Sequence, residues 1–88
     1  MAREVQTDVM SRLKRIEGQV RGLQRMIEEC RDCSEVVTQL AAVRHALDRV
    51  GFMILSHRLE ECVKKRAEQT GDAEASMDEA MKLFMTLA

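Results

Sequence analysis

The sequence predicts an all-α protein in which a three-helix subunit is organised around one long central helix. The chain has 88 residues, no proline and only two aromatic residues. Alanine, leucine, methionine, glutamate, lysine and arginine, which favour helices, are abundant. Apolar residues also recur at alternating steps of three and four, as on one face of a helix. We therefore expect a single helical domain over residues 1–88, with a core that is marginal on its own.

The first helix is predicted from an apolar stripe that ends at Ile27. The stripe consists of Val9, Leu13, Ile16, Val20, Leu23 and Ile27. Arg31 and Asp32 then break the periodicity. Asp32, with Glu35 three positions later, resembles a capping box in which Asp replaces Ser or Thr. Asp32 is therefore the expected N-cap of the second helix, and Cys33 its first residue.

The second helix is predicted to be long because its apolar stripe extends to His57. The stripe consists of Val36, Leu40, Val43, Leu47, Val50 and Ile54. The helix should run to about Ala67, a length of roughly 50 Å. Two shorter neighbours cannot cover such a helix, so part of its stripe would stay exposed in a monomer. We expect an antiparallel four-helix-bundle dimer to bury that part.

A short third helix is predicted to follow the only clear loop of the chain, residues 68–72. A glycine in this loop would stop the second helix, and Asp72 is a candidate N-cap for the third. Met77, Met81 and Phe84 then share one face. Methionine suits helix–helix interfaces, because its flexible side chain fills irregular gaps.

Two of the three cysteines, Cys33 and Cys62, lie near opposite ends of the predicted central helix. Cys62 follows Cys33 by 29 positions, which correspond to roughly 43 Å of helix. A disulfide requires Cα atoms within about 7 Å, so these two cysteines cannot meet inside one chain. In an antiparallel dimer the start of one long helix lies beside the end of the other. Any shared chemistry must therefore join Cys33 of one subunit to Cys62 of another.

The surroundings of both thiols favour the reactive thiolate form. Cys33 is at a helix N-terminus, where the helix dipole favours negative charge. Arg58 precedes Cys62 by one helical turn, about 40° around the axis. The alternative is that these residues are buried and act as small hydrophobic side chains. We find no signal peptide or membrane-spanning run, so we expect a cytoplasmic location, where cysteines serve redox or metal chemistry more often than structural disulfides.

A complete metal site is harder to find around these cysteines. A copper or zinc site would require a third ligand, typically histidine. His57 lies five residues before Cys62, about 140° around the helix, and a lone histidine on an apolar stripe is more often a hydrogen-bonded interface residue. Cys30 is three residues before Cys33 and could add a thiolate, act as a resolving thiol or take no part. No metal is expected, but Cu(I) would use Cys33 and Cys62.

Basic residues crowd the first quarter of the chain, although the net charge is only −1. They are Arg12, Lys14, Arg15, Arg21 and Arg25, and Arg44 and Arg49 follow on the second helix. An oligomer would multiply this patch and could neutralise several DNA phosphates. The alternative is an ordinary solvated helix face, on which these residues pair with neighbouring glutamates.

The segments RLKRIEGQVRGLQRMIEECRDC and VVTQLAAVRHALDRVGFMILSHRLEECV resemble the CsoR/RcnR family of bacterial transcriptional repressors over nearly the whole chain. The resemblance implies antiparallel dimers that assemble into homotetramers. It also implies operator binding without a helix-turn-helix, and release of DNA when an inducer binds between subunits. Arg12 and Arg49 match positions that the family associates with operator contact. We add Lys14, Arg15 and Arg21 as further candidates.

The resemblance also suggests which inducer the chain recognises. Copper-sensing members use a cysteine at the start of the long helix, plus a histidine and a cysteine four residues apart near its end. The cysteines match Cys33 and Cys62, but the histidine position is Arg58. A cysteine pair without this histidine is similar to the persulfide-sensing, CstR-type branch. We therefore expect a repressor that senses persulfide or polysulfide through an intersubunit Cys33–Cys62 pair and derepresses sulfide and sulfur detoxification genes.

Two alternatives remain open. The first is a Cu(I)-responsive repressor of copper efflux genes, with His57, Cys30 or an exogenous ligand completing the site formed by the same cysteines. The second is a thiol-bearing helical interaction protein that binds no DNA. An enzyme is not expected, because the sequence contains no acid–base constellation. No cofactor and no membrane partner are expected either.

Overall fold

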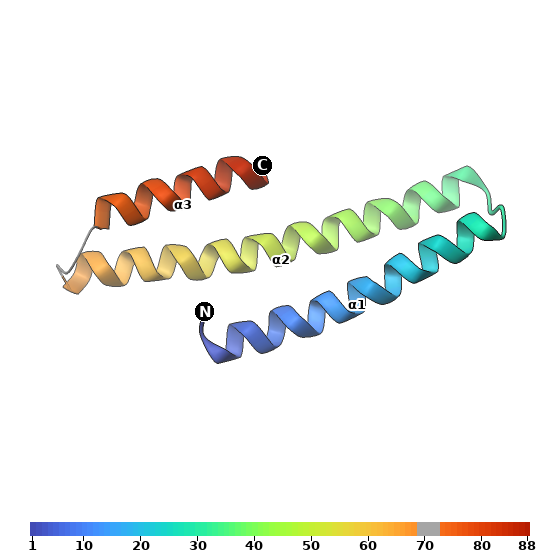
Figure 1. Ribbon diagram of the computed structural model, residues 1–88. Helices are drawn as coiled ribbons and strands as arrows, with labels where there is room; N and C mark the ends of the chain where they lie inside the picture. The colour runs from blue at the N-terminus through green and yellow to red at the C-terminus, as the bar shows by residue number, and fades with distance from the viewer. Residues whose placement is uncertain (69–72) are drawn as a thin grey trace.

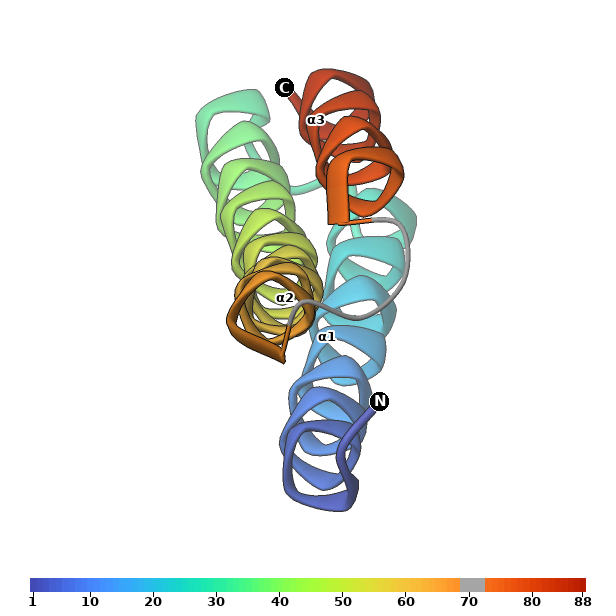
Figure 2. The ribbon, with the colours of Figure 1, turned by 90° about the vertical axis from the view of Figure 1, so that its left-hand side faces the viewer.

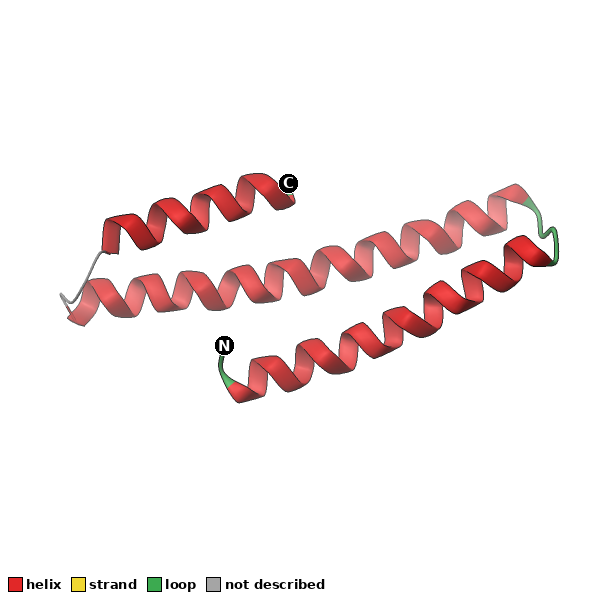
Figure 3. Cartoon of the chain, in the orientation of Figure 1, coloured by secondary structure: helices red, strands yellow, loops and turns green. Residues whose placement is uncertain are grey.

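Three helices lie side by side, with the longest in the middle (Figure 1). They are α1 (Arg3–Glu28), α2 (Cys33–Glu68) and α3 (Ala73–Leu87). The computed structural model describes the backbone of residues 1–68 and 73–88, and the side chains of residues 1–64 and 77–88. Only helices and loops occur within these ranges (Figure 3), and none of their helices is long and apolar enough to cross a membrane. The predicted all-α, three-helix subunit is confirmed.

The core lies between α1 and α2, which form an antiparallel hairpin (Figure 1). Val9 and Ile16 of α1 are buried in one cluster with Val43 and Val50 of α2. All four belong to the apolar stripes expected from the sequence. The helical periodicity therefore identified the residues that hold the hairpin together.

A second part of the α2 stripe is not covered within the subunit. Leu40, Leu47 and Ile54 are 51%, 47% and 40% exposed. They follow one another at seven-residue intervals, which places them along one side of the helix. A continuous apolar strip of this kind is unusual on a solvated helix and is typical of an interface.

The third helix packs on the C-terminal half of α2 (Figures 1 and 2). Ala80 is buried there, and Leu87 lies against Gly51 of α2. A Cβ atom added at Gly51 would lie 2.9 Å from Leu87 Cδ1, closer than packed carbon atoms approach. Gly51 therefore allows the end of α3 to approach the α2 backbone.

The face of α3 that carries Met77, Met81 and Phe84 is not the face that packs on α2. Met81 and Phe84 are exposed, whereas Met77 is partly buried and Ala80 is almost inaccessible. The buried positions advance by three and then by seven residues, to Leu87, so Ala80 and not Met81 faces α2. A large apolar residue such as Met81 is a natural candidate for burial. The small side chain of Ala80 faces α2 instead, because it lets the two helices pack closely.

The ends of the helices agree with the sequence within one residue where the structure describes them. α2 begins at Cys33, as predicted, and ends at Glu68, one residue after the expected Ala67. Glu68 is therefore helical and does not belong to the loop. The expected helix stop and the candidate N-cap Asp72 lie outside the described residues.

Candidate functional site

α1 ends in a Schellman motif in which Cys30 occupies the position usually taken by glycine. The backbone N–H of Cys30 donates to the carbonyl of Ile27 at 3.1 Å, and that of Arg31 donates to the carbonyl of Met26 at 2.9 Å. Cys30 has a φ of 54°, in the left-handed region that glycine adopts most easily. Its exposed side chain lies three residues before Cys33. Nothing in the local sequence indicated this backbone conformation.

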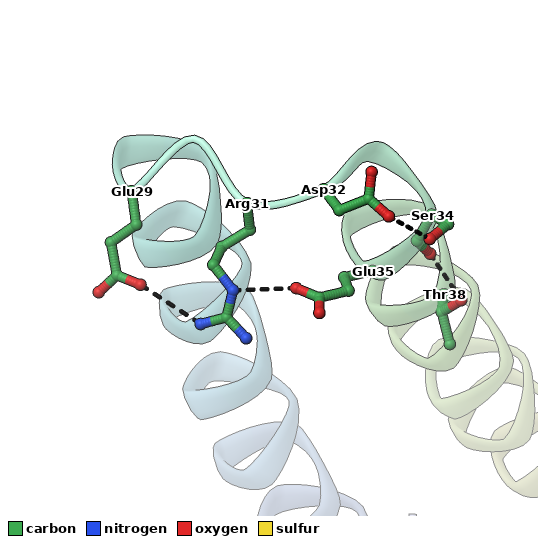
Figure 4. A network of polar contacts seen from close by, with 6 residues as sticks. All are labelled: Glu29, Arg31, Asp32, Ser34, Glu35 and Thr38. Atoms are coloured by element: carbon green, nitrogen blue, oxygen red, sulfur yellow. Dashed lines mark hydrogen bonds and ion pairs between the residues drawn. The ribbon is translucent and has the colours of Figure 1, made fainter.

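Side-chain contacts hold the turn from which α2 starts (Figure 4). Arg31 Nε donates to Glu35 Oε2 at 2.9 Å, and the Ser34 hydroxyl donates to Asp32 Oδ2 at 2.7 Å. The predicted capping box is therefore formed differently, because Arg31 engages the Glu35 carboxylate. The hydrogen bond to Glu35 raises the pKa of the Arg31 guanidinium. The turn presents the exposed Cys33 thiol on the first residue of the helix.

Cys62, in contrast, is fully buried, with 0% of its surface exposed. It belongs to the C-terminal half of α2, and α3 packs along that half of the helix (Figure 1). The sequence suggested that both thiols are activated, but in the subunit Cys62 fits the alternative of a buried, small side chain. The helix continues without a break from Cys33 to Cys62, roughly 43 Å apart, so the two cannot meet in one chain.

Arg58, the residue at the histidine position of the copper-sensing pattern, links α2 to α3. Its Nη1 donates to Glu61 Oε2 at 2.8 Å, and its Nη2 donates to Glu79 of α3. The hydrogen bonds to Glu79 and Glu61 raise the pKa of the guanidinium. Arg58 was expected to favour the Cys62 thiolate, but its terminal nitrogens are engaged by two carboxylates. A guanidinium held in this way stays protonated and cannot act as a metal ligand.

His57 of α2 connects the Arg58–Glu61 pair to the start of the chain, just before α1. Its Nε2 atom accepts the backbone N–H of Ala2 at 3.3 Å and lies 3.1 Å from Glu61 Oε1, to which it donates only when protonated. The pKa of Glu61 is lowered mainly by the hydrogen bond from Arg58; burial is the next-largest effect and opposes it, while nearby positive charges add to the lowering. The expectation that His57 is a hydrogen-bonded residue is confirmed.

We predict that replacing Glu79 with glutamine loosens α3 and makes Cys62 more reactive. The change removes the negative charge by which α3 binds Arg58 of α2, and it leaves α2 itself unaltered. In a background with Cys30 and Cys33 replaced by serine, the modification rate of Cys62 by a thiol reagent should rise several-fold. Glu60→Gln is the matched control, because Glu60 forms no ion pair among the described residues. An unchanged rate in Glu79→Gln, or an equal rise in the control, would contradict the role of the pair.

The described residues contain no cluster of three or more His, Cys, Asp and Glu side chains that could hold a metal ion. The three cysteines are divided between the two ends of α2, and His57 lies about 140° around the helix from Cys62. Any inducer site that uses both Cys33 and Cys62 must therefore combine residues of more than one subunit.

A groove of about 340 Å³ between α1 and α2 collects much of the positive charge. Its polar lining consists of Arg12, Arg15 and Gln19 from α1, and His45 and Arg49 from α2. We call it the arginine groove. Three of the five predicted DNA-binding residues thus lie together. The sequence analysis missed His45, although its spacing of four residues from Arg49 already placed the two on one side of α2.

The two other predicted DNA-binding residues lie elsewhere. Lys14 borders a separate hollow on α1 together with Arg3. Arg21 is paired loosely with Glu17, with 3.9 Å between Nη2 and Oε2. Both side chains of this pair are largely exposed, so the interaction contributes little to stability. The structure therefore divides the predicted basic patch into the arginine groove and an outer face of α1.

Comparison with known proteins gives a consistent match. A family model described as metal-sensitive transcriptional repressor matches residues 5–86. The copper-sensing transcriptional repressor CsoR of Bacillus subtilis (strain 168) is 40% identical over 76 residues, which span 86% of this chain and 74% of that protein.

Two solved structures share the fold of the chain. The copper-sensing repressor CsoR with Cu(I) from Geobacillus thermodenitrificans NG80-2 has a TM-score of 0.84 and 38% identity, covering 98% of this chain and 88% of that one. The nickel-responsive transcriptional regulator InrS has a TM-score of 0.83 and 39% identity, covering 93% and 91%. The chain therefore belongs to the family of metal-sensitive transcriptional repressors, the CsoR/RcnR family that its sequence resembles.

Proposed function

We propose that this repressor binds operator DNA and releases it when an inducer joins Cys33 of one subunit to Cys62 of another. The observation that carries the proposal is the position of the two cysteines at opposite ends of one unbroken helix. In an antiparallel pair of subunits the start of one α2 lies beside the end of the other. A site formed there depends on subunit arrangement, so a ligand that binds it can favour one arrangement over another.

The exposed apolar strip on α2 supports such a pairing. Leu40, Leu47 and Ile54 run along much of the helix, and a second copy of the same strip would cover them. Burial of apolar area is the main driving force for association of this kind. We propose that antiparallel dimers form through this strip and that dimers assemble into the homotetramer implied by the family resemblance.

Cu(I) is the inducer that the comparisons favour, ahead of the reactive sulfur species expected from the sequence. The Bacillus subtilis and Geobacillus relatives are both named as copper-sensing. Two cysteine thiolates are suitable donors, since soft sulfur ligands select Cu(I). Cys33 and Cys62 would hold the ion, and Cys30, His57 or a small exogenous ligand could complete the site. Bound Cu(I) would supply a link between two subunits.

Reactive sulfur remains a second candidate because of Arg58. This residue occupies the histidine position of the copper-sensing pattern, and it is already engaged by Glu61 and Glu79. In the reaction we propose, one cysteine thiol takes up a sulfur atom from hydrogen disulfide, giving a cysteine persulfide and hydrogen sulfide. The second thiol then displaces the outer sulfur as hydrogen sulfide, and a Cys33–Cys62 disulfide forms between subunits.

A direct comparison of the two inducers tests the proposal. The probe is an operator duplex selected by the protein from a random-sequence pool, and its affinity is measured after treatment with Cu(I) or with polysulfide, without oxygen. If Cu(I) is the inducer, stoichiometric copper held against a competing chelator releases DNA. If reactive sulfur is the inducer, polysulfide releases DNA and mass spectrometry finds an intersubunit Cys33–Cys62 bridge. Failure of both treatments to release DNA would refute the proposed site.

A further inference from the structure

The arginine groove contains polar groups that the subunit itself leaves unsatisfied. Arg12 forms a 3.5 Å ion pair with Asp8, but Arg15 and Arg49 have no ion pair among the described residues. The Oε1 atom of Gln19, an acceptor, is buried without a hydrogen-bond partner within the described part of the chain. The guanidinium groups of Arg15 and Arg49 are the unpaired donors, and charged donors of this kind are suited to bind an anion.

His45 faces the same groove from α2, one helical turn before Arg49. None of the described residues that line the groove is acidic, so no carboxylate competes there for the imidazole. The charged groups around it are Arg12 and Arg15 from α1 and Arg49 from its own helix. Arg12 and Arg49 also border a neighbouring hollow whose lining includes the carboxylates of Glu4, Asp8 and Glu60, and Asp8 is the one engaged by Arg12.

We propose that the arginine groove binds a phosphate of the DNA backbone and that His45 supplies a proton-dependent contact to it. The proposal rests on operator binding by this repressor, and it adds a dependence of that binding on pH. A phosphate bound in this groove favours the protonated imidazole of His45 and can accept a hydrogen bond from its N–H.

DNA binding and proton uptake are therefore linked, and the linkage is reciprocal. Histidine is the side chain that normally changes charge between pH 5 and pH 8. Lowering the pH across this range should strengthen operator binding, because more of the protein already carries the proton that the complex requires. Most phosphate contacts made by arginine show no such dependence, since arginine keeps its charge throughout.

The test is the operator affinity of the intact protein between about pH 6 and pH 8 at constant ionic strength. The probe is the duplex selected from a random-sequence pool. For the wild type we expect operator affinity to rise by about three- to ten-fold for each unit by which the pH is lowered. His45→Gln should bind DNA with a flat pH profile, and His45→Arg should bind tightly at every pH.

His57→Gln is the matched control, because His45 and His57 are the only two histidines of the chain. This variant should keep the pH dependence of the wild type. The inference is overturned if His45→Gln keeps the dependence, if His57→Gln loses it, or if wild-type affinity does not change with pH. A wild type that binds no DNA at any pH would instead refute the proposed function itself.

Discussion

Replacing both Arg12 and Arg49 with alanine is expected to lower operator affinity by at least about 100-fold, since each charge-assisted contact contributes about 1.5–3 kcal/mol. Both side chains line the arginine groove, one from each helix of the hairpin. They are exposed, so their loss leaves the core intact. The expected measurement is binding of the selected duplex as a function of salt. The slope of log affinity against log salt should become shallower, because fewer counterions are released.

A double variant that replaces Lys14 and Arg21 with alanine is the matched control. It removes the same charge from the subunit, but from the outer face of α1. We expect a smaller loss of affinity, caused mainly by the change in overall charge. If the control lost as much affinity as Arg12 and Arg49 together, the arginine groove would not be the DNA contact.

Much of the fold could be predicted because the hairpin depends on local periodicity. The residues that fill its core, Val9, Ile16, Val43 and Val50, were all on the expected stripes. The start of α2 was also predictable, since Asp32 precedes a regular apolar pattern. Both features depend on the spacing of residues within one helix, which the sequence displays directly.

The surroundings of Cys62 were not predictable, because they depend on how α3 packs on α2. Periodicity did not indicate that Ala80, and not Met81, is the buried residue of α3. For the same reason the pairing of Arg58 with Glu79, 21 residues away, could not be recognised. A charged residue has many possible partners in a sequence, and only the tertiary structure selects one.

The arginine groove illustrates an intermediate case. Clustering of basic residues on the first helix was evident, but the sequence could not separate those that face α2 from those that face away. Arg15 and Lys14 are adjacent, yet they border different hollows. The position of α2 decides which of them shares a site with Arg49. The place of His45 in the groove could not be predicted, because it depends on Arg12 and Arg15 of the other helix.

Cys33→Ala and Cys62→Ala are each expected to abolish the inducer response while operator binding persists. Neither residue lines the arginine groove, so the DNA contacts should remain. Each substitution removes one half of the proposed intersubunit site. For Cu(I), the loss of one of two thiolates should eliminate tight binding, and for reactive sulfur it should eliminate the bridge. Cys30→Ser is the control and should retain the response if Cys30 takes no part.

Hybrid assemblies provide the decisive measurement. Subunits that carry Cys33→Ala and subunits that carry Cys62→Ala are given different affinity tags, produced together and purified through both tags. Each hybrid pair then contains one intact site, made by Cys33 from one subunit and Cys62 from the other. We predict that the hybrids recover inducer binding and DNA release that neither variant shows alone. Hybrids that remain unresponsive, while the wild type responds, would contradict an inducer site shared between subunits.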